Sequence, residues 1–251
     1  MDEQSRQDAI DKIERERQTA IKKLEAQRIR INERFDHKEA ELGGKLNSKQ
    51  EQIIDAALEL LAEKGLNDLS VRDIAKKLDI KAPALYWYFK SKSELVDYMA
   101  EAMLSREFNG AKPRTENQAW QEWLAAYMGK LRKAMLAYPD GGRVVAVAHM
   151  YPSKTLAQIF DDCALSLTSA GIDQKTTTHT IMTAVHFTFG FVIEEQSSPR
   201  TEETRSFNQA DFLADYPNFR NMVEETVHDA GLGERMHAAG IQLIIKGAEV
   251  V

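Results

Sequence analysis

Cysteine and long apolar runs are almost missing from this sequence. Cys163 is the single cysteine in 251 residues, so neither an intrachain disulfide nor a multi-cysteine zinc site is expected. No stretch approaches the ~20 uninterrupted apolar residues of a membrane-spanning helix. The beginning, MDEQSRQDAID, is charged and has no apolar core of signal-peptide length. These absences predict a soluble, cytoplasmic protein with no membrane partner.

The motifs of common enzyme classes are absent as well. The chain contains no Gly-rich phosphate loop, His-Glu-x-x-His helix, Ser nucleophile elbow or paired-Cys motif. His179 and His186 are seven residues apart, whereas zinc motifs on a helix usually place two histidines about four residues apart. Core or interface positions are therefore the favoured interpretation of these histidines. We expect no enzymatic activity, no metal site and no cofactor.

The composition is that of a globular protein with a modest acidic balance. A hydrophobic content of 43% is sufficient for a sizeable core. The formal net charge of -6 argues against a protein that coats nucleic acid through bulk electrostatics. It does not exclude DNA binding, because a sequence-specific protein needs only one locally positive face.

The stretch from Ser70 to Lys92, SVRDIAKKLDIKAPALYWYFKSK, predicts two short helices joined by a turn at residues 79–81. Pro83 fits the first turn of the second helix, where its missing N–H would have no partner. Each helix has one apolar stripe at three- and four-residue spacing, formed by Val71, Ile74, Ala75 and Leu78 in the first and by Ala84, Leu85 and Tyr88 in the second. This layout is typical of a helix-turn-helix, whose second helix lies in the major groove of DNA. A plain helical hairpin with solvated charges is the alternative.

Some residues should stand on or beside the exposed side of the pair, where they could meet phosphates, sugars and thymine methyl groups: Arg72, Lys81, Tyr86, Trp87, Lys90 and Lys92. The candidate DNA-binding residues are Lys49, Arg72, Lys81, Ala82, Pro83, Ala84, Tyr86, Trp87, Tyr88, Lys90 and Lys92. Short side chains at Ala82 and Ala84 would let the second helix sit deep in the groove. We therefore expect these alanines, with Tyr86 and Trp87, to read bases, and the cations to position the DNA backbone.

Residues 52–99 resemble the DNA-binding domain of the TetR family of bacterial transcriptional regulators. The resemblance is spread over an apolar first helix, Gly65, a helix led by Ser70, the run Leu-Tyr-Trp-Tyr-Phe and a lysine before a leucine. Residues 138–143, YPDGGR, and 186–190, HFTFG, are similar to the ligand-binding half of the family's tetracycline-responsive members. The resemblance implies a homodimer that represses transcription from a palindromic operator until a small molecule releases it. It also implies that helices at about 175–196 and 232–249 pair across the dimer axis.

The same resemblance suggests a ligand site. In the tetracycline-responsive members a histidine shortly after the Asp-Gly element coordinates magnesium, and Val145 occupies that position here, so magnesium–tetracycline chemistry is not expected. His186 and Glu194 match a histidine and an acid of that site. The full set of candidate ligand-binding residues is Trp123, Tyr127, Leu131, Val145, His149, His186, Phe189 and Glu194. These residues favour a small apolar or aromatic effector, although plain core packing is the alternative for each aromatic residue.

Residues 2–42 are rich in charge and contain neither Gly nor Pro. Apolar residues recur there near a 3.5-residue spacing, which favours a coiled coil: Ile10, Ile13, Ala20, Leu24, Ile31, Phe35 and Leu42. Arg17, Gln27 and Lys38 interrupt this seam, and a solvated single helix is the alternative. Family resemblance implies nothing about this segment.

The expected fold class is all-α, with an N-terminal helix-turn-helix DNA-binding domain and a helical ligand-binding and dimerisation domain, preceded by a long coiled-coil-like helix. The expected boundaries are 1–44, 45–92 and 93–251. Within the last domain, helices are predicted over about 120–138, 144–150, 154–169, 175–196 and 234–251, and an exposed loop over 197–210. The main functional hypothesis is the ligand-controlled repressor. The alternative is a helical scaffold or adaptor that acts through the N-terminal coiled coil.

Overall fold

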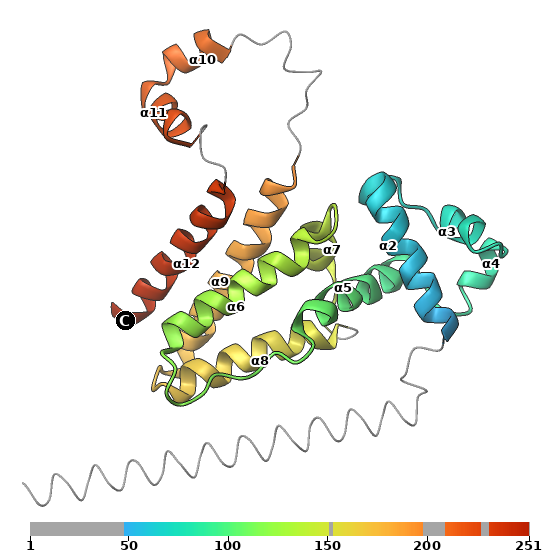
Figure 1. Cartoon of the computed structure of the whole chain (residues 1–251), viewed down its shortest axis with the longest axis horizontal. Helices are drawn as coiled ribbons and strands as arrows, with labels where there is room; N and C mark the ends of the chain where they lie inside the picture. Colours follow the sequence, from blue (N-terminus) through green and yellow to red (C-terminus); the bar gives the residue numbers. More distant parts are fainter. Residues whose placement is uncertain (1–47, 151–152, 198–208, 227–230, 251) are drawn as a thin grey trace, which may run out of the picture. The chain divides into compact units, whose positions relative to one another are not determined.

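The computed structural model describes residues 48–150, 153–197, 209–226 and 231–250, and these residues form helices joined by turns and loops (Figure 1). The helices are α2 (Ser48–Asp68), α3 (Val71–Lys77), α4 (Ala82–Leu85), α5 (Lys92–Phe108), α6 (Trp120–Leu136), α7 (Gly141–Val147), α8 (Lys154–Ser169), α9 (Gln174–Glu195), α10 (Gln209–Asp215), α11 (Pro217–Thr226) and α12 (Leu232–Val250). The predicted all-α class is confirmed. The chain divides into two compact units, Met1–Gln52 and Ile53–Val251. The predicted coiled coil lies outside the described residues.

Gly65 interrupts α2 and directs the chain toward α3. Its φ of 77° and ψ of 172° are not helical, and a residue without a Cβ adopts a positive φ at little cost. The next residue, Leu66, donates its backbone N–H to Asp140 Oδ2 at 2.8 Å. A Cβ on Gly65 would lie 3.0 Å from that same carboxylate oxygen. Glycine is therefore required both for the turn and for the close approach of Asp140.

A reciprocal side-chain cap starts α3. Ser70 Oγ accepts a hydrogen bond from Asp73 N at 3.1 Å, and the Ser70 hydroxyl donates to Asp73 Oδ2 at 2.7 Å. This hydrogen bond from Ser70 and one from Lys64 hold the pKa of Asp73 below its ordinary value. Because α3 has only seven residues, its stability depends on such a cap and on the burial of Ile74 and Ala75.

Replacing Ser70 with alanine should lower the free energy of unfolding by about 1 kcal/mol, the usual loss for an N-cap serine. Chemical denaturation followed by circular dichroism measures this difference. Ser93→Ala is the matched control, because Ser93 is an exposed serine on α5. Equal losses in the two variants would contradict a capping role for Ser70.

Helices α5 to α9 and α12 form the larger core. Helix α5 packs against α6, α7 and α8, while α9 contacts α6, α7, α8 and α12. The interior is filled by long apolar side chains, including Met99, Met103, Leu104, Leu124, Met128, Leu131, Met135, Ile159 and Leu167. Helices α6, α8, α9 and α12 follow the predicted ranges closely. Helix α7 begins earlier than predicted, because Asp140 adopts a left-handed conformation (φ 56°) and starts a helix at Gly141.

The chain between α9 and α12 contains two helices that the sequence pattern did not predict. Helix α10 begins at Gln209, inside the predicted loop, and α11 follows it at Pro217. The two helices pack on each other through an edge-on aromatic contact in which the ring centres of Phe212 and Phe219 are 6.4 Å apart.

Candidate nucleic-acid interface and cavity

The turn between α3 and α4 closes as the helix-turn-helix pattern predicts. Asp79 has a φ of 52°, and the next residue donates its N–H back to Ala75 O at 3.0 Å. A left-handed residue with this back-bond is a common way to end a helix. Pro83 lies in the first turn of α4. The predicted pair of short helices joined by a tight turn is therefore confirmed in its local geometry.

The buried side of this motif differs in part from the predicted stripes. Ile74, Ala75 and Leu85 are buried, whereas Val71, Leu78, Ala84 and Tyr88 are half-buried. Phe89, which was not assigned to the stripe, is 3% exposed and its ring lies edge-on to Tyr98 at 5.5 Å. The physical reason is that α4 ends at Leu85. The chain then tightens through a bond from Tyr88 N to Leu85 O, and Phe89 takes the interior position instead of Tyr88.

The aromatic candidates at the end of α4 are turned toward solvent. Tyr86 is 55% exposed and Trp87 is 88% exposed. Ala82 and Ala84 are half-buried beside them, and Pro83 is exposed. A tryptophan that packs so little against its own chain contributes little to the fold, so its large apolar surface is available to another molecule.

The cationic candidates differ in their surroundings. Arg72, Lys81 and Lys90 have exposed side chains. Lys92, in contrast, donates from Nζ to Leu69 O at 2.6 Å, which ties the start of α5 to the residue before the Ser70 cap. Lys49 belongs to the other compact unit, where its Nζ donates to Gln52 Oε1 at 3.3 Å. Lys92 therefore has an internal structural contact in addition to any role toward a partner.

Helix α5 connects the helix-turn-helix to the larger helical core as one uninterrupted element. Its N-cap, Ser91, accepts a hydrogen bond from Glu94 N at 3.0 Å, two residues after the buried Phe89. Its last residue, Phe108, is buried in the larger core. A second connection runs through the first turn of α7, where Arg143 donates from Nη2 to Asn67 Oδ1 at 2.9 Å. A displacement within the core can therefore reach the helix-turn-helix by two routes.

Two acids on α5 hold His149, just after α7, and Thr155, in the first turn of α8. The buried Asp97 accepts from His149 N at 2.8 Å, and His149 Nδ1 lies 3.2 Å from its carboxylate. Glu101, one helical turn later, accepts from Thr155 N and Thr155 Oγ1, each at 2.8 Å. The His149 side chain is 70% exposed. His149, one of the candidate ligand-binding residues, is thus hydrogen-bonded to α5 while most of its ring is exposed to solvent.

The remaining ligand candidates fall into a buried group and an exposed group. Trp123 and Tyr127 stack at 4.3 Å between ring centres, and Leu131 and Val145 are fully buried. On α9, His186 and Glu194 are exposed and Phe189 is half-buried in the single chain. The structure therefore brings together the candidates on α6 and α7 as core residues and leaves those on α9 at the surface.

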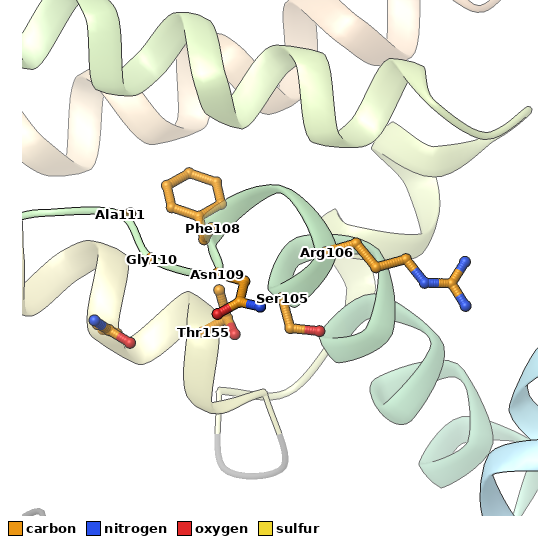
Figure 2. Close-up of a pocket in the computed structure, with 8 residues that line it drawn as sticks. Ser105, Arg106, Phe108, Asn109, Gly110, Ala111 and Thr155 are labelled. Carbon is orange, nitrogen blue, oxygen red and sulfur yellow. The ribbon is translucent and has the colours of Figure 1, made fainter.

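A cavity of about 420 Å³ lies where α5 ends (Figure 2). Its lining combines the end of α5, the following loop and the start of α8: Ser105, Arg106, Phe108, Asn109, Gly110, Ala111, Thr155 and Gln158. None of these residues belongs to the candidate set drawn from the sequence. The cavity nevertheless adjoins that set, because the Phe108 ring contacts the ring of Tyr127 edge-on at 5.2 Å.

Reactive and metal-binding groups are sparse. Within the described ranges, no three His, Cys, Asp or Glu side chains converge as metal ligands would. Cys163 is buried, and that burial raises the pKa of its thiol well above the usual range, which keeps it unreactive. None of the helices that the structure describes is long and apolar enough to cross a membrane.

Comparison with known protein families covers most of the chain. A family model described as bacterial regulatory proteins, tetR family, matches residues 53–99. A second model, described as tetracyclin repressor-like, C-terminal domain, matches residues 112–251. The tetracycline repressor protein class C of Escherichia coli is 33% identical over 202 residues, which is 80% of this chain and 90% of that protein.

Solved structures with the same arrangement are also found. A possible TetR family transcriptional regulator from Streptomyces coelicolor A3(2) has a TM-score of 0.68 and 27% identity, covering 80% of this chain and 98% of that one. A TetR variant from Acinetobacter baumannii AYE, in complex with minocycline, has a TM-score of 0.60 and 27% identity, covering 80% of this chain and 92% of that one. Fold and sequence therefore agree across both the helix-turn-helix and the larger helical core.

Proposed function

Because this chain belongs to the tetR family of bacterial regulatory proteins, we propose that it is a cytoplasmic, homodimeric transcriptional repressor that a small molecule releases from a palindromic operator. The observation that carries this proposal is the presentation of Trp87, 88% exposed, and Tyr86, 55% exposed, at the end of α4. In a helix-turn-helix the second helix enters the major groove. Trp87, the most exposed large hydrophobic residue in the described part of the chain, is thus located where bases would be read.

The candidate residues divide into two roles in this proposal. Ala82, Ala84, Tyr86 and Trp87 read base edges and thymine methyl groups, with Pro83 and Tyr88 beside them. Arg72, Lys81 and Lys90 contact phosphates, and Lys49 and Lys92 are further candidates for such contacts. Lys92 also fixes the start of α5 through Leu69 O, so its removal affects both the fold and DNA binding.

The effector signal passes along α5. In this proposal residues 45–92 form the DNA-binding domain and residues 93–251 the ligand-binding and dimerisation domain. Helix α5 starts behind the recognition helix and ends beside the 420 Å³ cavity. A ligand that shifts the end of this helix changes the spacing of the two recognition helices in a dimer. That spacing must match half-sites about one DNA turn apart, ~34 Å, so a small shift weakens binding.

The effector itself is a small apolar or aromatic molecule in this proposal. Trp123, Tyr127, Leu131 and Phe189 supply aromatic and aliphatic surface, and His186, Glu194 and His149 supply polar groups. Val145 is fully buried and cannot ligate a metal, so binding does not use magnesium at that position. The N-terminal residues 1–44 pair as a marginal coiled coil when dimerisation raises their local concentration.

Replacing Trp87 with alanine should weaken binding to the preferred operator about tenfold or more and relax base preference, with no change in stability. A lost base contact costs roughly 1–3 kcal/mol, and an 88% exposed side chain contributes little to the fold. The operator is first selected from a random-sequence DNA pool with the full-length protein. Fluorescence anisotropy at fixed salt then gives the affinity of each variant for the selected sequence and for single-base changes in it.

Lys81→Ala is the contrasting variant. Loss of one phosphate contact should weaken binding to all sequences alike and reduce the slope of log affinity against log salt by about one. Unchanged affinity and base preference in Trp87→Ala would remove Trp87 from base reading. If the selection yields no preferred DNA sequence at all, the repressor proposal is wrong and the result favours the scaffold hypothesis.

A further inference from the structure

Helix α4, which lies wholly within the described residues, offers no hydrogen-bonding side chain to a partner. Its four residues are alanine, proline, alanine and leucine. Leu85 is the buried member of the helix. The surface left for another molecule, which we call the α4 face, consists of Ala82, Pro83, Ala84 and the indole ring of Trp87. Apart from the single indole N–H, this face can recognise a partner only by apolar contact.

Backbone hydrogen bonds hold the α4 face in place on both sides. Before the helix, Ile80 donates its N–H to Ala75 O at 3.0 Å, and after it Tyr88 donates its N–H to Leu85 O at 2.9 Å. Helix α4 also packs against α3 (Figure 1). The apolar surface is therefore already ordered before a partner binds, so binding loses little conformational entropy there.

Exposed cations accompany the α4 face. Lys81 comes directly before α4 and makes no side-chain capping hydrogen bond, and Arg72 and Lys90 are exposed as well. Cations beside an apolar surface match the major groove of DNA, where phosphates line the edges and thymine methyl groups lie among the base edges. The occupant of this face is therefore duplex DNA.

The apolar group that an unmodified base pair presents in the major groove is the C5-methyl of thymine. Cytosine has a hydrogen at C5, whereas 5-methylcytosine carries a methyl group at the same ring position as thymine. We propose that the α4 face recognises the C5-methyl group of a pyrimidine, so that 5-methylcytosine can replace thymine in the operator and methylation of cytosine at C5 strengthens binding. This inference rests on the proposed function and specifies the chemical group that its recognition helix reads.

The size of the effect follows from burial of the methyl group. One buried methyl group changes affinity about fourfold. A palindrome presents the methyl group to α4 of both subunits, so the change for both half-sites together is about sixteenfold. Thymine should still bind more tightly than 5-methylcytosine, because the amino group of 5-methylcytosine would face apolar side chains without an acceptor. Unmethylated cytosine should bind most weakly of the three.

Modified operators test the inference without any change in the protein. The full-length protein first selects its operator from random-sequence DNA, and symmetric pairs of thymines in that operator are then replaced by deoxyuridine, one pair at a time. Fluorescence anisotropy at fixed salt should reveal at least one pair whose replacement raises the Kd about sixteenfold. At that responsive pair, 5-methylcytosine opposite guanine should bind more tightly than cytosine opposite guanine by a similar factor.

Two variants test whether the α4 face is the surface that reads the methyl group. Ala82→Gln places an amide against the bases, and the favoured base partner of that amide is adenine. Operators with thymine and with deoxyuridine at the responsive pair should therefore bind this variant equally. Lys90→Ala removes an exposed cation outside the α4 face, so it should weaken binding to both operators alike and leave the ratio of their affinities unchanged.

Three results would overturn the inference. They are equal affinity for thymine and deoxyuridine at every pair, binding of 5-methylcytosine no tighter than that of cytosine, and an unreduced thymine–deoxyuridine ratio in Ala82→Gln, since another surface would then hold the methyl group. A selected operator that shows no dependence on the methyl group refutes this inference alone and leaves the proposed function standing. If the protein selects no operator, the proposed function is wrong and this inference is wrong with it.

Discussion

Replacing Leu243 with glutamate is expected to convert the proposed dimer into a monomer that remains folded. Leu243 on α12 is 70% exposed in the single chain, and Met236 on the same helix and Met182 on α9 are 49% and 38% exposed. Since α12 and α9 pack on each other, they present exposed apolar side chains that a second copy would cover. A glutamate there remains hydrated in the monomer but is buried without a partner in the dimer, at a cost of roughly 3–5 kcal/mol.

This position separates dimerisation from folding better than its neighbours do. Ile241 and Ile245 are 1% and 2% exposed, so a charge at either residue would disrupt the chain's own core. Sedimentation velocity should show the monomer mass for Leu243→Glu, circular dichroism should be unchanged, and binding to the selected palindrome should be lost. Gln174→Glu adds the same charge at an exposed position at the start of α9 and should remain dimeric. An unchanged dimer of Leu243→Glu would exclude this face as the interface.

The sequence predicted the helix-turn-helix well because its signals are local. Ser70 caps α3, Asp79 takes the left-handed turn position and Pro83 begins α4, and each of these features depends on a few neighbouring residues. The prediction that Tyr88 is buried was wrong, because Phe89 occupies that interior position. Its position depends on the shortness of α4 and on the Tyr98 ring from the next helix, and helical spacing alone does not contain that information.

The cavity at the end of α5 and the buried polar residues of α8 could not be predicted in the same way. Phe108 and Thr155 line one cavity although they lie far apart in the sequence. Asp162 and Ser166 fit an ordinary amphipathic helix, and only the packing of the folded chain shows that they are buried. Helices α10 and α11 were missed because their apolar residues contact each other instead of forming a long periodic face against the core.

His237 on α12 is another feature that no sequence pattern indicated, and it makes stability depend on pH. The residue is 3% exposed, and its ring stacks on Phe187 at 5.6 Å and meets the ring of Phe191 edge-on at 5.5 Å. Thr188 Oγ1 lies 3.0 Å from His237 Nε2 and donates its only proton to Ala184 O. The imidazole must therefore donate from Nε2 to Thr188, which the neutral ring can do.

Burial lowers the pKa of His237 to about 4, and the nearby Arg132 acts in the same direction, while Glu195 opposes it. Arg132 and Glu195 are paired with each other at 2.5 Å. The ordinary pKa of the histidine, 6.5, applies in the unfolded chain, so the unfolded state binds the extra proton first as the pH falls. The contribution of His237 to the free energy of unfolding is therefore fully present above pH 6.5 and decreases as the pH falls toward 4. Below pH 4 this contribution changes no further.

The loss over this interval should approach about 3 kcal/mol, since each pKa unit corresponds to about 1.4 kcal/mol. His237→Phe keeps an aromatic ring of similar size but cannot take up a proton, and Thr188 retains its bond to Ala184 O. Urea denaturation between pH 4 and 8 should give a smaller decrease in unfolding free energy for this variant than for the unmodified protein. His179→Gln, which removes an exposed histidine on α9, should leave the decrease unchanged. Parallel curves for the unmodified protein and His237→Phe would mean that His237 takes up its proton equally easily when folded, contrary to its enclosure by Phe187 and Phe191.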